Sequence, residues 1–512
     1  MGNEEEGQAR PEAEPDTEPA AETKVEAKPK TCTYEKVDGD RCQLQAMADS
    51  SAGLCMFHEP VASKDGAAAT REFLKRVDAG DHDFEGYQLE DADLSGKVFH
   101  SDMIFRRAVF TGKTSFQEAN FTEHAFFQDA EFKGEVDMGK ARFANDVSFE
   151  DVTFRGETSF EEARFDGGSY WVKAVFKRDA VFKESAFGEE ARFEEVRFGP
   201  HVDFAHAKFF GDVHFDDLRV EGTLYLGFAE FLKYAFFMEA EAQGKADFSF
   251  AQFMNYADFT RSKWKELNMT DVIFERRGCF DGSVIESGTF EDAELRHVTF
   301  RSVDMANVFT TGASLEEAYM SQAQWGTPVR GPLGKKLVVR EETMANEEGT
   351  REALIRAEAA HRNLKESYKN EGDYGTAGEF FIREMDIRAR VALMDREYGY
   401  WVMSKLISGL CGYGERPTRV IFWWFAFTFT FAIIYFTGQL IQYSDGVTEI
   451  DFGTLSGFLT CFYFSVVTFT TLGFGDISPV TDLGRGVASV EAFTGAFMIA
   501  LFVLVFGRKM IR

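Results

Sequence analysis

From Phe105 onward, large apolar residues recur at steps that alternate between five and six residues, so the pattern repeats every eleven residues. A helix repeats every 3.6 residues and a strand every two, whereas a coil with four short sides places one large side chain inside at each side. We therefore expect a β-helical coil of about 22 residues. The first residues that set this rhythm are Phe105, Phe110, Phe116, Phe121, Phe127, Phe132, Met138, Phe143, Phe149, Phe154, Phe160 and Phe165.

Two periods of the pattern place phenylalanines one above another, a ladder typical of stacked parallel strands. Small residues stand two positions before them and are expected to point inward as well. After Phe274 the steps shorten to nearly strict fives as far as Trp325. The ladder residues are Phe121, Phe143, Phe165, Phe187, Phe209, Phe231 and Phe253, and the small residues are Ala119, Ala141, Ala163, Ala207, Ala229 and Ala251.

This spacing resembles the pentapeptide-repeat family over residues 84–326, which implies a right-handed quadrilateral β-helix. The longer steps depart from a strict five and imply bulged corners in the first part. Some family members mimic DNA with a strongly acidic surface, but the outward positions here carry both signs, as at Glu131, Arg142 and Arg164. A solvated face is therefore the favoured interpretation, and the rod is expected to be a spacer or platform.

Two uncharged or nearly uncharged segments, residues 420–441 and 486–507, are long enough to cross a membrane. Buried helices of a soluble protein are the alternative, but two of them at the end of an otherwise polar chain make it the weaker one. Basic residues flank the pair on its outer ends, whereas residues 442–484 contain no Lys or Arg. The positive-inside rule then predicts a multi-pass protein of the cytoplasmic membrane with both termini cytoplasmic.

Between these segments, residues 453–470 are apolar but too short to span, which predicts a re-entrant pore helix beginning after Asp451. A threonine followed by alternating glycines comes next, at residues 471–475. We interpret this segment as an ion filter, because non-helical backbone at membrane depth is tolerated only where it is buried in protein or lines a wet path.

Residues 462–476, reading FYFSVVTFTTLGFGD, resemble the pore signature of two-transmembrane potassium channels, within a pore module at 416–512. The resemblance implies a homotetramer around one permeant K⁺ path. It also implies that Phe474 replaces the commoner tyrosine and its bracing hydroxyl. The implied filter groups are the Thr471 hydroxyl and the carbonyls of Thr471, Leu472, Gly473 and Phe474, with Gly473 and Gly475 supplying unusual backbone angles and Asp476 at the outer mouth.

Two residues of the second span are further candidates. Gly495 matches a glycine that family members use as a hinge, although a helix glycine equally serves close packing. Glu491 lies one turn earlier, and an intramembrane carboxylate is a functional candidate. We expect it to support the filter by hydrogen bonding behind the pore helix.

Near the N-terminus, residues 31–60 contain the pattern Cys-x9-Cys-x12-Cys-x2-His. Three thiolates and one imidazole suit a structural, tetrahedral Zn²⁺ in a knuckle too small for its own core, with unrelated thiols as the alternative. Residues 1–30 are expected to be a disordered acidic tail and residues 61–83 a linker or helix. The four proposed ligands are Cys32, Cys42, Cys55 and His58.

Residues 335–415 are expected to be a helical connector. The spacing of Leu364, Tyr368, Gly372, Ala377 and Phe381 resembles a single tetratricopeptide-type hairpin with Gly372 at its turn. One repeat cannot form a peptide groove, so a structural role joining the rod to the membrane is favoured over peptide binding.

The formal net charge of −29 argues against a nucleic-acid partner. The sequence shows no Arg-rich voltage sensor, no nucleotide-binding motif and no convincing catalytic arrangement, so we expect no enzyme. The favoured hypothesis is a potassium-selective channel with a cytoplasmic regulatory or scaffolding rod. The alternatives are a membrane-tethered scaffold that binds an unidentified cytoplasmic protein and a nonselective cation channel.

Overall fold

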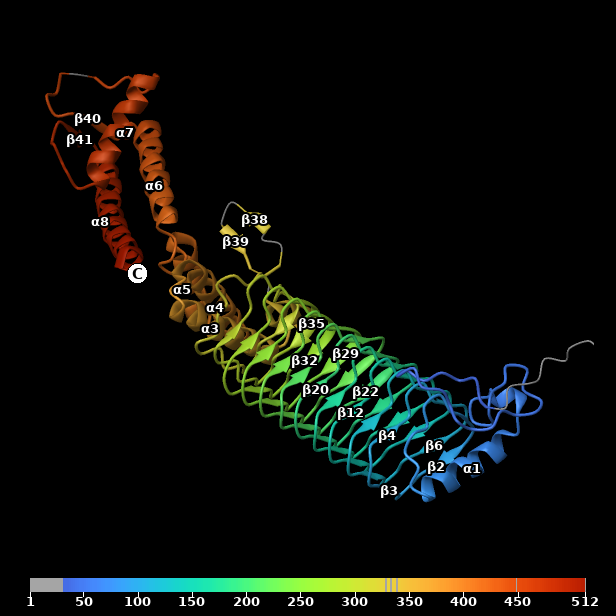
Figure 1. The fold of residues 1–512 in the computed structure, drawn as a ribbon. Helices are drawn as coiled ribbons and strands as arrows, with labels where there is room; N and C mark the ends of the chain where they lie inside the picture. Colours follow the sequence, from blue (N-terminus) through green and yellow to red (C-terminus); the bar gives the residue numbers. More distant parts are fainter. Residues whose placement is uncertain (1–30, 327–328, 332–333, 338, 448, 512) are drawn as a thin grey trace, which may run out of the picture.

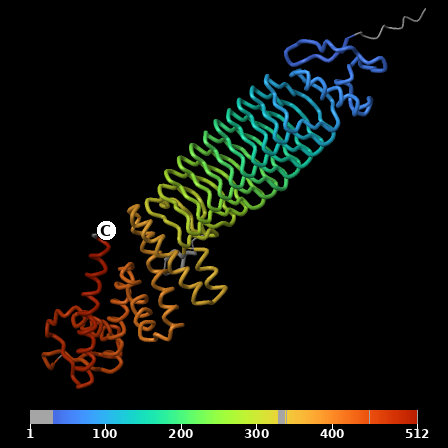
Figure 2. The backbone as a smooth tube through the Cα atoms, turned by 90° about the horizontal axis from the view of Figure 1, so that it is seen from below, coloured from blue at the N-terminus to red at the C-terminus, as the bar shows by residue number. Residues whose placement is uncertain are grey.

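The computed structural model describes residues 31–326, 329–331, 334–337, 339–447 and 449–511. The predicted tail at residues 1–30 lies outside the described residues. The described chain forms a long rod of stacked coils, with a small module at its N-terminal end and helices at its C-terminal end (Figure 1). The tube view shows the coils following one another along a single axis (Figure 2).

The rod is a β-solenoid, as the repeat predicted, built from short parallel strands in four stacks. The third stack contains β3 (Val98–Phe99), β7 (Asn120–Phe121), β11 (Arg142–Phe143), β15 (Arg164–Phe165), β19 (Ala186–Phe187), β23 (Lys208–Phe209), β27 (Glu230–Phe231), β30 (Gln252–Phe253) and β33 (Ile273–Phe274). The fourth contains β4 (Met103–Ile104), β8 (Ala125–Phe126), β12 (Val147–Ser148), β16 (Ser169–Tyr170), β20 (Ala191–Arg192), β24 (Val213–His214), β28 (Ala235–Phe236), β31 (Ala257–Asp258), β34 (Gly278–Cys279) and β36 (Val298–Thr299).

The first two stacks merge into one sheet, because three late strands are long enough to turn the corner between them. The first stack contains β1 (Gln88–Leu89), β5 (Val109–Phe110), β9 (Glu131–Phe132), β13 (Thr153–Phe154), β17 (Val175–Phe176), β21 (Arg197–Phe198) and β25 (Arg219–Val220). The second contains β2 (Ala92–Asp93), β6 (Thr114–Ser115), β10 (Val136–Asp137), β14 (Thr158–Ser159), β18 (Ala180–Val181), β22 (His201–Asp203), β26 (Thr223–Tyr225) and β37 (Val308–Phe309). The shared strands are β29 (Glu241–Asp247), β32 (Lys263–Asn268) and β35 (Val284–Thr289).

The strand register confirms the predicted coil length and its shortening. After a first pairing of 21 positions, between β1 and β5, paired residues lie 22 positions apart through most of the rod, then 21 and then 20 toward the C-terminal end. This follows from the pairs Val98 with Asn120, Gln252 with Ile273, and Gly278 with Val298. Each coil therefore exchanges backbone hydrogen bonds with the coils on both sides of it, as parallel stacking requires.

The corners of the coils contain residues in a backbone conformation that the sequence pattern did not predict. Every eleventh residue has a positive φ although it is not glycine, and it falls inside a five-residue step. Such residues cost roughly 1 kcal/mol each in local strain, which the packed interior must offset. They are Arg107, Glu118, Asp129, Lys140, Asp151, Glu162, Lys173, Glu184, Glu195, His206, Asp217, Phe228, Glu239, Phe250 and Arg261.

The interior of the rod is a set of aromatic ladders, and the predicted ladder is confirmed. Phe165, for example, is almost fully buried and stacks between Phe143 and Phe187, with ring centroids 5.1 and 4.9 Å away. The predicted alanines, such as Ala141 and Ala163, are also completely buried. Each ladder receives one side chain, most often a ring, from every coil, so the stacked coils share one continuous core.

The N-terminal end of the rod is covered by a short 3-10 helix η1 (Val61–Ser63) and by α1 (Gly66–Asp78). Asp65 caps α1 by accepting a hydrogen bond from the amide of Ala68 at 2.9 Å. Phe73 of α1 packs against Phe84 of the first coil, with ring centroids 4.9 Å apart. This end of the aromatic core is thereby closed to water.

The C-terminal end of the rod is closed by α2 (Arg340–Glu348), α3 (Arg351–Asn370) and α4 (Tyr374–Met394). The carboxylate of Glu371 accepts hydrogen bonds from the backbone amides of Met320, at 2.5 Å, and Ser321, at 2.8 Å. Buried Glu341 likewise accepts from the amide of Thr310 at 2.5 Å. These acids supply acceptors for last-coil amides that have no further coil above them.

Helices α3 and α4 form the predicted hairpin, with Gly372 turning at a φ of 84°. Leu364, Tyr368 and Ala377 are buried between the helices and the rod. The expected contact by Phe381 is wrong, because its neighbour Phe380 packs inward instead while Phe381 is only half-buried. A hairpin (β38, Val329–Gly331; β39, Gly334–Lys336) precedes the helices.

The chain ends in α5 (Tyr398–Cys411), α6 (Pro417–Gly438), α7 (Leu455–Phe469) and α8 (Asp482–Ile511), with a small strand pair, β40 (Ile441–Tyr443) and β41 (Ile477–Pro479). Helices α6 and α8 are long and apolar enough to cross a membrane, and only 22% of each span is buried inside the chain. Helix α7 is shorter and packs against both of them. The arrangement leaves most of the apolar surface of this module outward.

Replacement of Phe165 with alanine is expected to destabilise the rod by about 3–5 kcal/mol, because the ring is lost from a closed stack. The control Phe210→Ala removes a ring that is 45% exposed, and should cost less than about 1 kcal/mol. Hydrogen exchange of coil amides in the detergent-solubilised full chain measures both. Equal effects of the two substitutions would contradict the stacked core.

Candidate ion pathway and metal centre

The predicted filter segment begins where α7 ends. Thr470 caps that helix, and the amides of Thr471 and Leu472 still donate to the carbonyls of Thr468 and Val467 at 3.1 and 3.0 Å. The segment therefore leaves the helix from a fixed point. The carboxyl end of α7, which is the negative end of its dipole, is directed at this segment.

The sign of φ alternates along the segment. Thr471, Gly473 and Gly475 have φ values of 58°, 56° and 80°, whereas the two residues between them have negative φ. In an ordinary strand successive carbonyls point to opposite sides. When the sign of φ alternates from residue to residue, every second peptide is turned over, so that successive carbonyls point to the same side. The segment can thus present a row of carbonyl oxygens to one path.

The side chains of this segment find no cover in their own chain. Leu472 is 62% and Phe474 is 66% exposed. Beyond them, the carbonyl of Asp476 accepts a hydrogen bond from the amide of Ser444 at 2.9 Å, next to the β40 and β41 pair. The far end of the segment is thereby bonded to the residue that follows β40, while the side chains in its middle are exposed.

Glu491 of α8 is completely buried and touches both other helices of the module. One carboxylate oxygen accepts a hydrogen bond from the hydroxyl of Tyr435 of α6 at 2.7 Å, and the other is hydrogen-bonded to the hydroxyl of Ser465 of α7. Ser465 in turn lies 2.8 Å from the carbonyl oxygen of Thr428 of α6. A single carboxyl group therefore links three helices behind the predicted filter.

Gly495 lies one turn further along α8, against the end of α7. A Cβ atom at this position would stand 2.0 Å from the carbonyl oxygen of Phe469 and 2.7 Å from its carbonyl carbon. Such a distance is too short for any side chain. The backbone of α8 thus approaches the base of the filter segment as closely as a glycine permits.

Ion pairs that the sequence did not predict join the connector to the start of α6 and to the end of α8. Arg416, just before α6, pairs with Glu379 of α4 at 2.7 Å. Arg508 of α8 pairs with Glu415 at 3.0 Å, and its guanidinium lies 5.4 Å from the ring of Phe381. Helix α4 thus contacts the residue before α6 through Glu379 and the end of α8 through Phe381.

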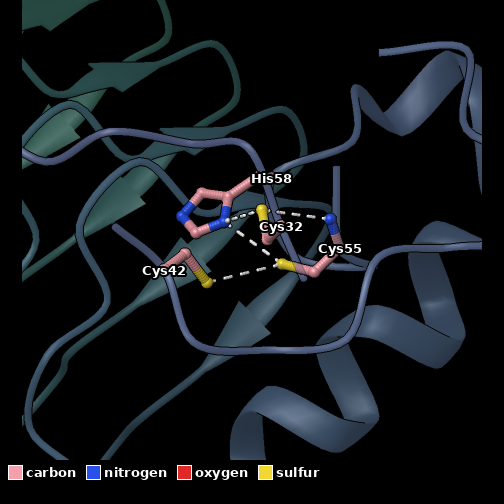
Figure 3. A group of neighbouring side chains, drawn as sticks. All are labelled: Cys32, Cys42, Cys55 and His58. Atoms are coloured by element: carbon pink, nitrogen blue, oxygen red, sulfur yellow. Dashed lines mark hydrogen bonds between the residues drawn. The ribbon is translucent and has the colours of Figure 1, made fainter. Parts of the chain in front are cut away.

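The four predicted metal ligands come together at the N-terminal end of the rod (Figure 3). Their ligand atoms all lie within 4.8 Å of one another, and all four residues are buried. The Sγ atoms of Cys42 and Cys55 are 4.0 Å apart, and Nδ1 of His58 lies 3.1 Å from Sγ of Cys55 and 3.4 Å from Sγ of Cys32. A tetrahedral ion with Zn–S bonds of about 2.3 Å needs sulfurs about 3.8 Å apart, so the set fits zinc.

The imidazole of His58 is oriented by residues outside the ligand set. Its Nε2 atom lies 2.9 Å from the backbone carbonyl of Glu85, which can only accept, so Nε2 carries the proton and Nδ1 is available to a metal. The ring of Tyr34 stacks on the imidazole, with centroids 3.9 Å apart. Because Glu85 belongs to the first coil of the rod, the candidate metal site lies against the solenoid.

Comparison with known protein families agrees with both resemblances. Residues 420–512 match a family model described as an ion channel. Residues 83–142 and 172–219 match a model of pentapeptide repeats, in nine copies. With two apolar helices of membrane length in the matched region, the chain is a membrane protein. It joins a pentapeptide-repeat β-solenoid to an ion-channel domain in one polypeptide.

Proposed function

We propose that four copies of this chain form a potassium-selective channel, with residues 471–475 of each copy around one axis. The alternating sign of φ at Thr471, Gly473 and Gly475 carries the proposal, because it lets successive carbonyls face one path. As in known potassium-channel filters, these oxygens would replace the hydration shell of K⁺. One chain supplies one wall of such a path, so closure requires a symmetric oligomer.

The exposure of the channel domain supports this assembly. Phe474 and Leu472 are exposed in the single chain, as are Phe493 at 78% and Phe497 at 54% on α8. Neighbouring copies and lipid are the natural cover for this apolar surface. Asp476 would place a negative charge at the outer mouth.

The charge distribution supports a position in the cytoplasmic membrane with both termini inside. Arg416 and Arg419 precede α6, and Arg508 and Lys509 end α8, whereas residues 442–484 contain no Lys or Arg. The rod would then lie in the cytoplasm. The ion pairs of Arg416 and Arg508 with the connector give the rod a route by which to regulate the pore.

One observation favours a partner-binding role of the rod beside conduction. The rings of Phe228 and Phe250 stack 4.7 Å apart on a corner of the solenoid, and they are 48% and 43% exposed. Exposed aromatic pairs of this kind mark interaction surfaces more often than isolated ones do. A membrane-tethered scaffold with a silent pore remains the second candidate function, and a nonselective cation pore is the third.

The metal centre is proposed to hold a structural Zn²⁺. Its four ligands leave no open position for substrate, and the site closes the N-terminal end of the rod. The carbonyl of Phe57, next to His58, accepts a hydrogen bond from the amide of Gln88 in the first coil at 2.7 Å. The metal would therefore hold the cap on the rod.

Reversal potentials of the purified protein in liposomes separate the three functions. A selective K⁺ channel gives a potential near the K⁺ equilibrium value under a K⁺/Na⁺ gradient. A potential near zero in a biionic gradient indicates the nonselective pore, and the absence of current indicates the scaffold.

Gly473→Asp is expected to abolish K⁺ flux, because a side chain is strained at this positive φ and projects into the row of carbonyls. Gly446→Asp is the matched control, since Gly446 also has a positive φ, of 67°, and open space at its Cβ position. Flux of both variants is measured in the same liposomes. Loss of flux in the control alone, or in neither variant, would overturn the filter assignment.

Gly495→Ala is expected to prevent assembly of a conducting channel, because its methyl group would overlap the carbonyl of Phe469. Gly486→Ala, on the same helix but with no atom within 4 Å of the added methyl, should assemble. Gel filtration in detergent and K⁺ flux are the measurements. A hinge role predicts instead that Gly495→Ala assembles normally and changes only channel opening.

Cys55→Ser is expected to lose one zinc ion per chain and to lower the melting temperature, because a structural site contributes its binding energy to folding. Cys279→Ser is the control, since that cysteine lies half-buried in the rod away from the ligand set. Metal analysis and thermal unfolding check both variants. Full zinc content in Cys55→Ser would refute the ligand set.

A further inference from the structure

The hydroxyl of Ser465 has more acceptors than it has protons. Its oxygen lies 2.8 Å from the carbonyl oxygen of Thr428 and is also hydrogen-bonded to a carboxylate oxygen of Glu491. A carbonyl has no hydrogen, and a serine hydroxyl has only one. If Glu491 were ionised, one of these two short contacts would join two oxygens with no proton between them.

A proton on Glu491 satisfies every group in the cluster. The hydroxyl of Tyr435 donates to one carboxyl oxygen, at 2.7 Å. The other carboxyl oxygen donates to Ser465, and Ser465 donates to the carbonyl of Thr428. The chain of hydrogen bonds then runs in one direction, from α6 through α8 and α7 and back to α6.

The surroundings of Glu491 favour the same state. Its partner Tyr435 packs in a buried cluster with Cys461 and Phe464, and none of the ion pairs in the described part of the chain involves Glu491. The nearest charged residues on α8, Asp482 and Arg485, pair with each other at 3.2 Å and are exposed. A buried carboxylate without a cation would be costly, whereas a hydrogen-bonded acid is not.

We propose that Glu491 holds a proton in the folded channel domain and acts as a positioning residue, donating to Ser465 so that α7 is fastened between α6 and α8. The inference rests on the proposed function only in that α7 carries the filter. Glu491 itself touches no permeant ion in this arrangement. Its proton fixes the helix from whose end residues 471–475 emerge.

Infrared spectroscopy of the full-length protein in lipid tests the proton directly. The wild-type spectrum at neutral pH should contain a protonated-carboxyl stretching band that is absent from Glu491→Gln. Identical spectra in this region would show an ionised carboxylate and overturn the proposal. This readout needs no ion flux, so a failure of the channel assignment and a failure of the proton assignment are distinguished.

Substitutions provide the second test. Glutamine copies the hydrogen-bond count of the acid, since its amide donates to Ser465 and its carbonyl accepts from Tyr435, so Glu491→Gln should keep flux and assembly within about twofold of wild type. Glu491→Leu leaves the Tyr435 hydroxyl without a partner, and flux of assembled channel should fall at least about tenfold. Ser465→Ala should fall likewise, whereas Ser489→Ala, whose hydroxyl bonds only within α8 at 2.9 Å, is the control. A Gln variant as impaired as the Leu variant would contradict the protonated state.

Discussion

A backbone group that is buried away from water needs a hydrogen-bond partner, and this constraint shapes both ends of the rod and the channel domain. A solenoid satisfies its own coils but exposes the amides and carbonyls of its first and last turns. The N-terminal end is closed by α1 and by the module that contains the candidate metal ligands, and the C-terminal end is closed by the carboxylates of Glu341 and Glu371. The same requirement governs the channel domain, where the polar groups of Tyr435, Ser465 and Glu491 satisfy one another in an apolar environment.

The two capped ends make the rod a continuous body between the candidate metal site and the channel domain. At the connector, Tyr368 hydrogen-bonds both the indole of Trp325, at 2.8 Å, and the carbonyl of Met320, at 2.7 Å, so the helical hairpin is bonded to the last coils. The ion pair of Glu379 with Arg416 then connects the hairpin to the start of α6. The ion pair of Glu415 with Arg508 connects the segment before α6 to the end of α8. The physical path from the solenoid to the channel domain consists of packed side chains and charge-assisted bonds throughout.

Much of the fold follows from the sequence because its strongest signals repeat. The regular recurrence of phenylalanine predicts the solenoid directly, and the long, nearly uncharged segments of α6 and α8 predict the membrane spans. The corner conformations left no such mark, because residues such as Glu118 and Asp129 adopt a positive φ that glycine usually provides. Phe380 was missed in favour of Phe381 because a hairpin pattern fixes spacing only to within one residue when both neighbours are aromatic.

The sites were predictable to different degrees for a similar reason. The ligands of the metal centre are identifiable by residue type, but Glu85 orients His58 through a backbone carbonyl, which residue type does not reveal. Glu491 stood out as an acid in an apolar segment, whereas its partners Tyr435 and Ser465 are ordinary residues in sequence and gain their role only from the meeting of three helices. Contacts between distant segments are harder to derive from a single sequence than periodicity or residue type.

The shortening of the coils from 22 to 20 residues gives the rod a direction. Because the number of residues in a coil changes along the rod, its coils are not interchangeable. A duplicated or deleted coil would match its neighbours only within the long-perimeter part, and the last turns before the connector would tolerate neither. Insertion of a whole coil is therefore compatible with the 22-residue part of the rod and incompatible with the 20-residue part that joins the helices.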